Sequence, residues 1–355
     1  MSEDVWSAQD TTPDDIEAAL RELLRERHAA DRALAPARVL NLVVVVDREW
    51  KGEISNRLQN VGRYHASRTI LCSVEDGRTT LDAVATIAYD DSAGPGVHPM
   101  RERVDIDVGS GQLDRLDTVV DPILVAELPT LLWSPHGHDE AVRSLLPLTD
   151  AILLDSDDED VCGGLTYPAR LRESVYVVDL AWLRTTPWRE RLAASFDPLH
   201  RRPALERLTG VCVRHRRTSR ASASLLAGWL ATRLDWQAIP LHDGNGGGAR
   251  GSVADAEGKR EIAITLAPQD QDVPGLAGVT VEWEGGCSLS LDRGRGGLTA
   301  RQGGGETRER SWRVLGASRG EGLILGEGVR QALLRDTTYG PALDSALVLS
   351  GCGSP

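Results

Sequence analysis

The run Val39-Leu-Asn-Leu-Val-Val-Val-Val46, which Asp47 closes, decides the fold of this chain. It is almost continuously apolar and rich in β-branched residues, and a strand that is apolar on both faces is usually buried inside a parallel or mixed sheet. A helical pattern follows near residues 50–61, and a second strand is expected at residues 67–74. This order of strand, helix and strand predicts a sheet with helices on its faces.

The rest of the first half continues the alternation of strands and helices. A first helix is expected near residues 12–24, where Thr12 is a suitable N-cap and Pro13 a suitable first helical residue. Residues 81–89 and 103–108 alternate weakly between apolar and polar side chains, which predicts antiparallel strands. The other elements expected here are helices at residues 114–126 and 141–146 and strands at residues 128–133 and 152–155.

The second half begins after an acidic, glycine-bearing stretch at Ser156–Gly164, which predicts a hinge between two domains. We therefore expect domains at residues 1–156 and 157–355, with the glycine-rich residues 243–258 as a flexible internal loop of the second. Gly285-Gly286 is placed where a hairpin turn would join two strands. The other elements expected here are strands at residues 175–180, 208–214, 261–266, 279–283, 288–291 and 311–314 and helices at residues 187–194, 219–234 and 323–334.

These patterns predict an α/β fold with two domains. The N-terminal domain would hold a mixed sheet flanked by helices. The C-terminal domain would be α/β and end in a short antiparallel sheet and a closing helix.

Charge and composition narrow the function classes. The chain has 355 residues and a formal net charge of −13, which argues against nucleic-acid or anionic-membrane binding, because both need a positive surface. No apolar run approaches the roughly 20 residues that a membrane span needs, and the acidic N-terminal region does not resemble a signal peptide. The five cysteines are scattered without a Cys-x-x-Cys pair and favour a reducing compartment. We therefore expect a cytoplasmic protein.

The sequence contains no complete catalytic or cofactor-binding motif. Gly246–Gly251 formally matches the dinucleotide pattern Gly-x-Gly-x-x-Gly, but no strand is expected before it and no helix after it. Asp155–Asp160 resembles the opening of a calcium loop, but it lacks the glycine at loop position six, and a solvated acidic hinge is the favoured interpretation. His136 and His138 lack further ligands at useful spacing for a metal site. We expect no cofactor, no metal and no enzymatic activity.

Two segments could carry a binding function. The first, Gly62–Thr69, places arginines, a histidine and hydroxyls immediately before a strand. It could clamp an anion or carboxylate through the arginine forks, or it could only pin the strand by side-chain hydrogen bonds. Its candidate partner-binding residues are Arg63, Tyr64, His65, Ser67 and Arg68.

The second segment, Asp179–Arg189, has two tryptophans and two arginines in one strand-to-helix turn, with Thr186 as the expected cap and Pro187 as the first helical residue. Tryptophan and arginine are common at the energetic centres of interfaces, but the indoles could equally fill the core of a chain with one phenylalanine. We assign Trp182 to the core and leave Trp188 open. The candidates are Trp182, Arg184, Trp188 and Arg189.

Several short segments follow one another in a characteristic order along the chain. They are Arg38-Val-Leu-Asn-Leu-Val43, His65-Ala-Ser-Arg-Thr-Ile70, Leu128-Pro-Thr-Leu-Leu-Trp133, Asp179-Leu-Ala-Trp182, Trp188-Arg189 and Leu226-Ala-Gly-Trp-Leu-Ala231. Taken in this order, they resemble the glucose-6-phosphate dehydrogenase assembly protein family, OpcA. The resemblance covers residues 16–343 and departs from the family pattern at Ala66 and Ser134.

The resemblance implies a non-catalytic assembly factor that binds glucose-6-phosphate dehydrogenase, activates it allosterically and acts in the oxidative pentose phosphate pathway. The alternative is an enzyme or small-molecule binder that uses the Arg63, His65 and Arg68 loop for a phosphorylated ligand. That alternative requires these side chains to converge on a pocket. Side chains that are consumed by internal hydrogen bonds would count against it.

Overall fold

The computed structural model divides the chain into two compact units. The first comprises Met1–Leu154, Val175–Val178 and Leu325–Leu334, and the second comprises the rest. A single boundary after Ser156 therefore misses two later segments that return to the first unit. The structure describes residues 2–30, 34–36, 38–61, 67–89, 98–294, 296–304, 307–315 and 321–353.

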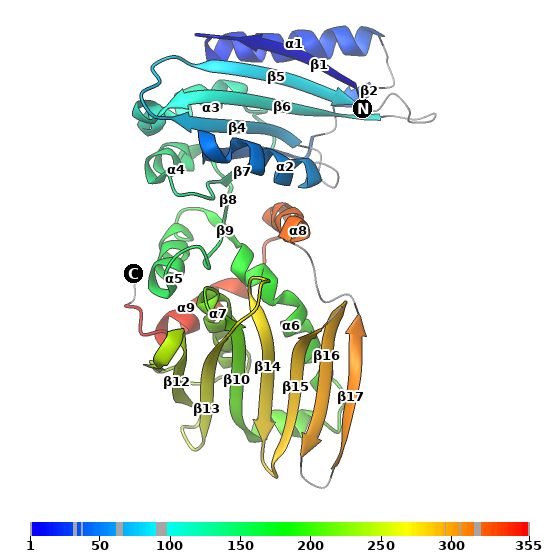
Figure 1. Ribbon diagram of the computed structural model, residues 1–355, viewed down its shortest axis with the longest axis vertical. Coiled ribbons are helices and arrows are strands. Elements are labelled where there is room, and N and C mark those ends of the chain that lie inside the picture. The colour runs from blue at the N-terminus through cyan, green and yellow to red at the C-terminus, as the bar shows by residue number, and fades with distance from the viewer. Residues whose placement is uncertain are drawn as a thin grey trace. The chain divides into compact units, whose positions relative to one another are not determined.

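The first unit is built on a mixed sheet with the strand order β1-β5-β6-β4-β3-β7-β8-β9, and β2 pairs with β6 (Figure 1). Residues 40–46 of the predicted run form most of its strand β3, which is buried along nearly its whole length, as predicted. The strands are β1 (Ser2–Ala8), β2 (Leu34–Pro36), β3 (Leu40–Asp47), β4 (Ser67–Glu75), β5 (Asp82–Tyr89), β6 (His98–Gly109), β7 (Thr130–Trp133), β8 (Ala151–Leu154) and β9 (Tyr176–Asp179).

Strands β6, β4, β3, β7 and β8 run parallel, whereas β1 and β5 are antiparallel to their neighbours. From β3 the chain first builds outward through β4 to β6, and then returns to the other side of β3 and continues through β7, β8 and β9. The strand order therefore reverses between β3 and β7. This is the order of the doubly wound dinucleotide-binding fold, in which ligands bind at such a reversal.

The helices of the first unit follow the predicted pattern with one exception. Thr12 Oγ1 accepts a hydrogen bond from Asp15 N and caps α1, whose Ile16 and Leu20 are buried. The prediction of a single helix at residues 114–126 is wrong. The region forms three short helical elements, and Pro122, which cannot donate a backbone hydrogen bond, lies in the last of them. The elements are α1 (Pro13–Ala30), α2 (Lys51–Val61), α3 (Asp117–Val120), α4 (Asp139–Leu145) and the 3₁₀ helices η1 (Arg48–Trp50), η2 (Ser110–Arg115), η3 (Asp121–Ile123) and η4 (Leu146–Leu148).

The second unit holds a sheet with the order β11-β12-β13-β10-β14-β15-β16-β17, in which β10 and β13 run parallel and the other pairs are antiparallel. Gly285 and Gly286 have φ values of 83° and 69° and form the predicted hairpin turn. The strands are β10 (Leu208–Arg216), β11 (His242–Asp243), β12 (Ala249–Ala254), β13 (Glu261–Gln269), β14 (Leu276–Trp283), β15 (Cys287–Gly294), β16 (Gly297–Gly304) and β17 (Thr307–Leu315).

The prediction of a flexible loop at residues 243–258 is wrong. Residues Ala249 and Val253 point to the same face of β12 and are buried in the core, so the middle of this segment is a strand of the sheet. The sequence pattern also missed β16, whose glycines and single apolar pair hide its alternation.

Helices cover one face of the second sheet, which Figure 1 shows with its strands in front of α6 and α7. Gly228 of α7 allows a close approach of α9, because a Cβ there would lie 2.3 Å from Ala342 O. The expected closing helix at residues 323–334 is followed by a further one, α9. The elements are α5 (Val161–Leu171), α6 (Leu180–Phe196), α7 (Arg220–Arg233), α9 (Tyr339–Leu349), η5 (Arg202–Arg207) and η6 (Asn245–Gly247), whereas α8 (Glu321–Leu334) belongs mostly to the first unit.

Cys162 at the start of α5 forms a disulfide with Cys352, which follows α9. The scattered cysteines gave no sign of this pairing, because the two residues lie 190 positions apart. Among the helices of the described ranges, none has both the length and the apolar character needed to cross a bilayer.

Candidate functional site

The candidate residues of the first segment divide between described and undescribed positions. Arg63, Tyr64 and His65 lie outside the described residues. Ser67 and Arg68 begin β4, and Arg68 is only 2% exposed. Its guanidinium lies 2.7 Å from Glu102 Oε2, 2.8 Å from Glu17 Oε2 and 2.7 Å from Ile123 O. Arg68 is thus consumed by internal contacts, which argues against its use as a ligand clamp.

The second segment is interior rather than a surface turn. Trp182 and Trp188 are 2% and 1% exposed, so the core assignment of Trp182 is confirmed and Trp188 joins it. The predicted start at Thr186-Pro187 is wrong, because Asp179 already caps α6 by accepting a hydrogen bond from Ala181 N, and Pro187 lies inside the helix. Tertiary contacts can override the local preference of proline for the first turn of a helix, so that the helix begins before the proline.

The two arginines of this segment hold the second unit together. Arg184 donates two hydrogen bonds to Asp155, at 2.7 Å and 2.6 Å between the nitrogen and oxygen atoms. The guanidinium of Arg189 lies 3.5 Å from the centroid of the Trp182 ring, and Trp182 Nε1 donates to Asp336 Oδ2 at 2.8 Å. Burial lowers the pKa of Arg189 to about 10. Their internal contacts fit a role in supporting a surface from within, and their part in partner binding stays a prediction.

The expected acidic hinge is half buried. Asp155 and Asp157 face inward and lie 2.6 Å and 4.0 Å from the guanidinium of Arg184, and the charge of Asp155 also acts on the buried Asp179. Asp179 accepts hydrogen bonds from Ser156 N, from Ser156 Oγ and from the hydroxyl of Tyr339. The interpretation of this stretch as a solvated hinge is wrong for Asp155–Asp157, because Asp155 pairs with Arg184 of α6 and Asp157 accepts hydrogen bonds from Ser222 of α7.

The excess of negative charge at this buried cluster shifts its titration. Burial, followed by the charge of Asp155, raises the pKa of Asp157 to about 7 and that of Asp179 to about 6. Ser222 donates to Asp157 through its backbone N–H at 3.0 Å and its hydroxyl at 2.6 Å. Burial and the charge of Asp155 thus outweigh the Ser222 hydrogen bonds and Arg184, which lower the pKa of Asp157.

We expect Asp157→Asn to flatten the pH dependence of folding. Because the folded pKa of Asp157 is raised, the folded chain binds more protons than the unfolded chain between about pH 4 and pH 7, and the free energy of unfolding falls as pH rises through this window. Asparagine keeps an acceptor and a donor for Ser222. Urea unfolding should therefore find the variant more stable than the parent at pH 8 and similar to it near pH 4. A variant less stable than the parent at pH 8 would contradict this assignment.

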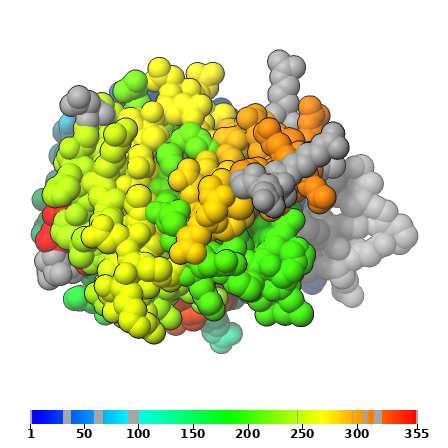
Figure 2. Space-filling model, turned by 90° about the horizontal axis from the view of Figure 1, so that it is seen from below, coloured from blue at the N-terminus to red at the C-terminus, as the bar shows by residue number. Residues whose placement is uncertain are grey.

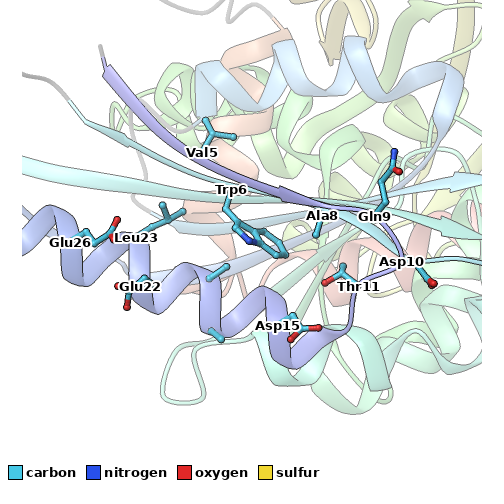
Figure 3. A pocket seen from close by; sticks show the side chains of 12 residues that line it. Val5, Trp6, Ala8, Gln9, Asp10, Thr11, Asp15, Glu22, Leu23 and Glu26 are labelled. Carbon is cyan, nitrogen blue, oxygen red and sulfur yellow. The ribbon is translucent and has the colours of Figure 1, made fainter.

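A groove between β1 and α1 was not anticipated from the sequence. The β1–α1 groove has a volume of about 660 Å³, and Figure 3 shows Trp6 reaching from β1 towards the helix. Its apolar side is formed by Val5, Trp6 and Leu23, whereas its charged lining residues are all acidic. These acids are Asp10, Asp15, Glu22 and Glu26.

The strand beside this groove is also free to pair. β1 is the terminal strand of the sheet order, so its backbone groups on one side have no strand partner among the described residues. An acidic groove next to a sheet edge suits an extended, positively charged segment. The sequence feature that could have predicted β1 is an alternation of exposed and partly buried positions. The exposed ones are Glu3, Val5 and Ser7 and the partly buried ones are Asp4, Trp6 and Ala8, but the acidic residues among them hide the pattern.

The reversal point of the first sheet does not fit the dinucleotide that its topology implies. The turn after β3 runs Asp47-Arg-Glu-Trp50 and has no glycine, although a pyrophosphate needs close backbone approach. Arg48 Nη1 lies 3.2 Å from Glu75 and 3.3 Å from Asp107, and the Trp50 ring packs 5.1 Å from that of His136. Charged and aromatic side chains thus meet where phosphates would lie.

The histidine pair next to this turn makes local contacts. His138 Nε2 lies 3.2 Å from Asp47 Oδ1, and burial lowers the pKa of His136. Within the described ranges, no three histidine, cysteine or acidic side chains cluster closely enough to hold a metal ion.

Known proteins resemble the chain in fold and in sequence. An NAD-binding oxidoreductase from Klebsiella pneumoniae has a TM-score of 0.50 at 9% identity over 88% of this chain and 95% of its own, which shows the fold alone. Relatives described as putative OxPP cycle protein OpcA occur in Synechocystis, at 28% identity over 37% of this chain, and in Synechococcus elongatus, at 25% identity over 49%. The matched regions cover 28% and 41% of the lengths of these relatives.

Two family models match the chain in sequence order. The glucose-6-phosphate dehydrogenase subunit N-terminal domain matches residues 58–166, and the corresponding C-terminal domain matches residues 175–343. Together they span most of the chain and reproduce the resemblance that the motifs indicated. The chain therefore belongs to the OpcA family of glucose-6-phosphate dehydrogenase subunits.

Proposed function

We propose that this chain is a non-catalytic assembly factor that binds glucose-6-phosphate dehydrogenase and activates it allosterically. The observation that carries this proposal is the match of both domains of the dehydrogenase subunit family in their proper order. The misfit of the reversal point to a dinucleotide supports a role without redox chemistry of its own. The chain would act in the cytoplasm, within the oxidative pentose phosphate pathway.

Activation would follow from unequal affinity for two states of the dehydrogenase. The chain would bind the active oligomer more tightly than the inactive form, and the activation cannot exceed that ratio of affinities. The β1–α1 groove is the contact that we favour, because it joins an acidic lining to a free strand edge. The contacting segment of the dehydrogenase is then expected to be basic.

Mixing the purified chain with its cognate dehydrogenase tests the proposal. We expect co-elution on a sizing column and a higher kcat/KM than for the dehydrogenase alone. Replacing Glu22 and Glu26 together by arginine should weaken co-elution at least tenfold, because it reverses the charge of the groove. Asp14→Arg, on the same helix but outside the groove lining, is the matched control and should change little.

The possible results test the proposed function and the proposed contact surface separately. Absence of both co-elution and kinetic change in the unmodified chain would overturn the proposed function. Normal co-elution of the Glu22→Arg, Glu26→Arg variant would instead overturn the β1–α1 groove as the contact.

A further inference from the structure

A second pocket, here called the arginine pocket, lies in the second unit between α6 and strands β15–β17. Its volume is about 400 Å³. Its floor is apolar and includes Leu291 and Ala300, which belong to the core of this unit, together with Val314. Trp312 pairs with Ala300 across β16 and β17 and remains 36% exposed. The inner face of the sheet is thus incompletely covered at this edge.

The pocket is strongly positive. Arg191 of α6, Arg201 and Arg310 of β17 line it, and no acidic residue does, in a chain with a net charge of −13. Figure 2 looks onto the end of the unit where the green segment that includes α6 and η5 lies beside the orange strands β16 and β17. Three guanidinium groups that share one hollow repel each other unless an anion lies between them.

The arginines are not consumed by internal pairs. Within the described part of the chain, no carboxylate forms an ion pair with Arg191, Arg201 or Arg310, and Arg191 Nε is buried without a hydrogen-bond partner. Among the described residues, the hydrogen bond that Arg201 donates is to the carbonyl oxygen of Ser195, at 3.2 Å. Buried donors are normally paired, as those of Arg184 are.

We propose that the arginine pocket binds a small molecule that carries a phosphate or carboxylate group on an apolar or aromatic body. Guanidinium forks bind such oxyanions in a bidentate manner, and three of them would neutralise more than one negative charge. The apolar floor and the exposed Trp312 ring would hold the uncharged part of the molecule. The volume lies within the range of small-molecule sites.

Titration calorimetry of the full chain with inorganic phosphate and phenyl phosphate, at constant ionic strength and without the dehydrogenase, tests this site. We expect saturable binding of both probes, with phenyl phosphate several-fold tighter because its ring contacts Trp312. Arg191→Gln and Arg310→Gln should each weaken binding at least tenfold. Trp312→Ala should remove the advantage of phenyl phosphate while leaving phosphate binding in place.

Arg313→Gln is the matched control, because Arg313 lies on the same strand and its register places it on the opposite face of the sheet. It should change both dissociation constants less than twofold, and thermal melts should show every variant folded. No saturable binding, or equal losses in Arg310→Gln and Arg313→Gln, would overturn the proposal. So would an Arg310→Gln defect confined to assays with the dehydrogenase, which would assign the pocket to an acidic side chain of that partner.

Discussion

Arg184→Met is expected to lower the free energy of unfolding of the second unit by about 3–5 kcal/mol. The substitution removes the cationic partner of Asp155 and Asp157 and leaves these two inward-facing carboxylates without a compensating charge beside the buried Asp179. The loss should grow between pH 5 and pH 8, because these carboxyl groups escape the penalty by protonation at the lower pH. Urea unfolding followed by far-UV circular dichroism at both pH values measures it.

Two further variants distinguish a buried charge from a lost contact. Arg217→Met removes an exposed pair with Asp270, whose side chains are 58% and 86% exposed, and should change stability by less than about 1 kcal/mol. Adding Asp155→Asn to Arg184→Met should restore part of the loss, since it removes one of the unpaired carboxylates. If Arg184→Met destabilised the chain no more than Arg217→Met, the proposed role of the carboxylate cluster would be wrong.

Removing the disulfide is expected to have an effect of similar size. Cys162 and Cys352 close a loop of 190 residues, for which the chain-entropy model gives about 5 kcal/mol. The double replacement Cys162→Ser, Cys352→Ser should therefore lower the melting temperature by roughly 10 °C or more. Scanning calorimetry of the parent and the variant under non-reducing conditions measures the difference.

A reducing agent provides the internal control for this prediction. It should lower the melting temperature of the parent to that of the double variant and leave the variant unchanged. Cys287→Ser, which alters a free thiol, should have little effect in either condition. Equal melting of the parent and the double variant without reductant would rule out a stabilising bond. Because disulfides are rare in the cytosol, the result also bears on the proposed compartment.

The parts of the fold that could be predicted are those whose signal is local. The apolar composition of residues 39–46 is enough to predict a buried strand. Gly285-Gly286 supplies the positive φ values that the hairpin needs. β12 and β16 escaped prediction because their glycines mask a short alternation that only pairing with neighbouring strands stabilises. The doubly wound strand order likewise depends on contacts between distant segments.

At the candidate site, too, the local sequence could be interpreted but the distant partners could not be predicted. Arginine and tryptophan near residue 184 suggested an interface, but Arg184 pairs with Asp155 and Trp182 with Asp336, which is 154 positions away. A sequence cannot show that such partners exist. The three arginines of the pocket come from α6, from the segment before η5 and from β17, so no local motif unites them. Arg63, Tyr64 and His65 remain a prediction.

The interleaving of the two units also sets the order in which the chain can fold during synthesis. The first unit requires Val175–Val178 and Leu325–Leu334, so it cannot be completed until residue 334 has left the ribosome. β8 lacks its neighbouring strand β9 until residue 179 has emerged, and the unit lacks Leu325–Leu334 for much longer. The incomplete first unit is therefore exposed to aggregation for longer than a contiguous N-terminal domain would be. Chaperones would have to protect it during that time.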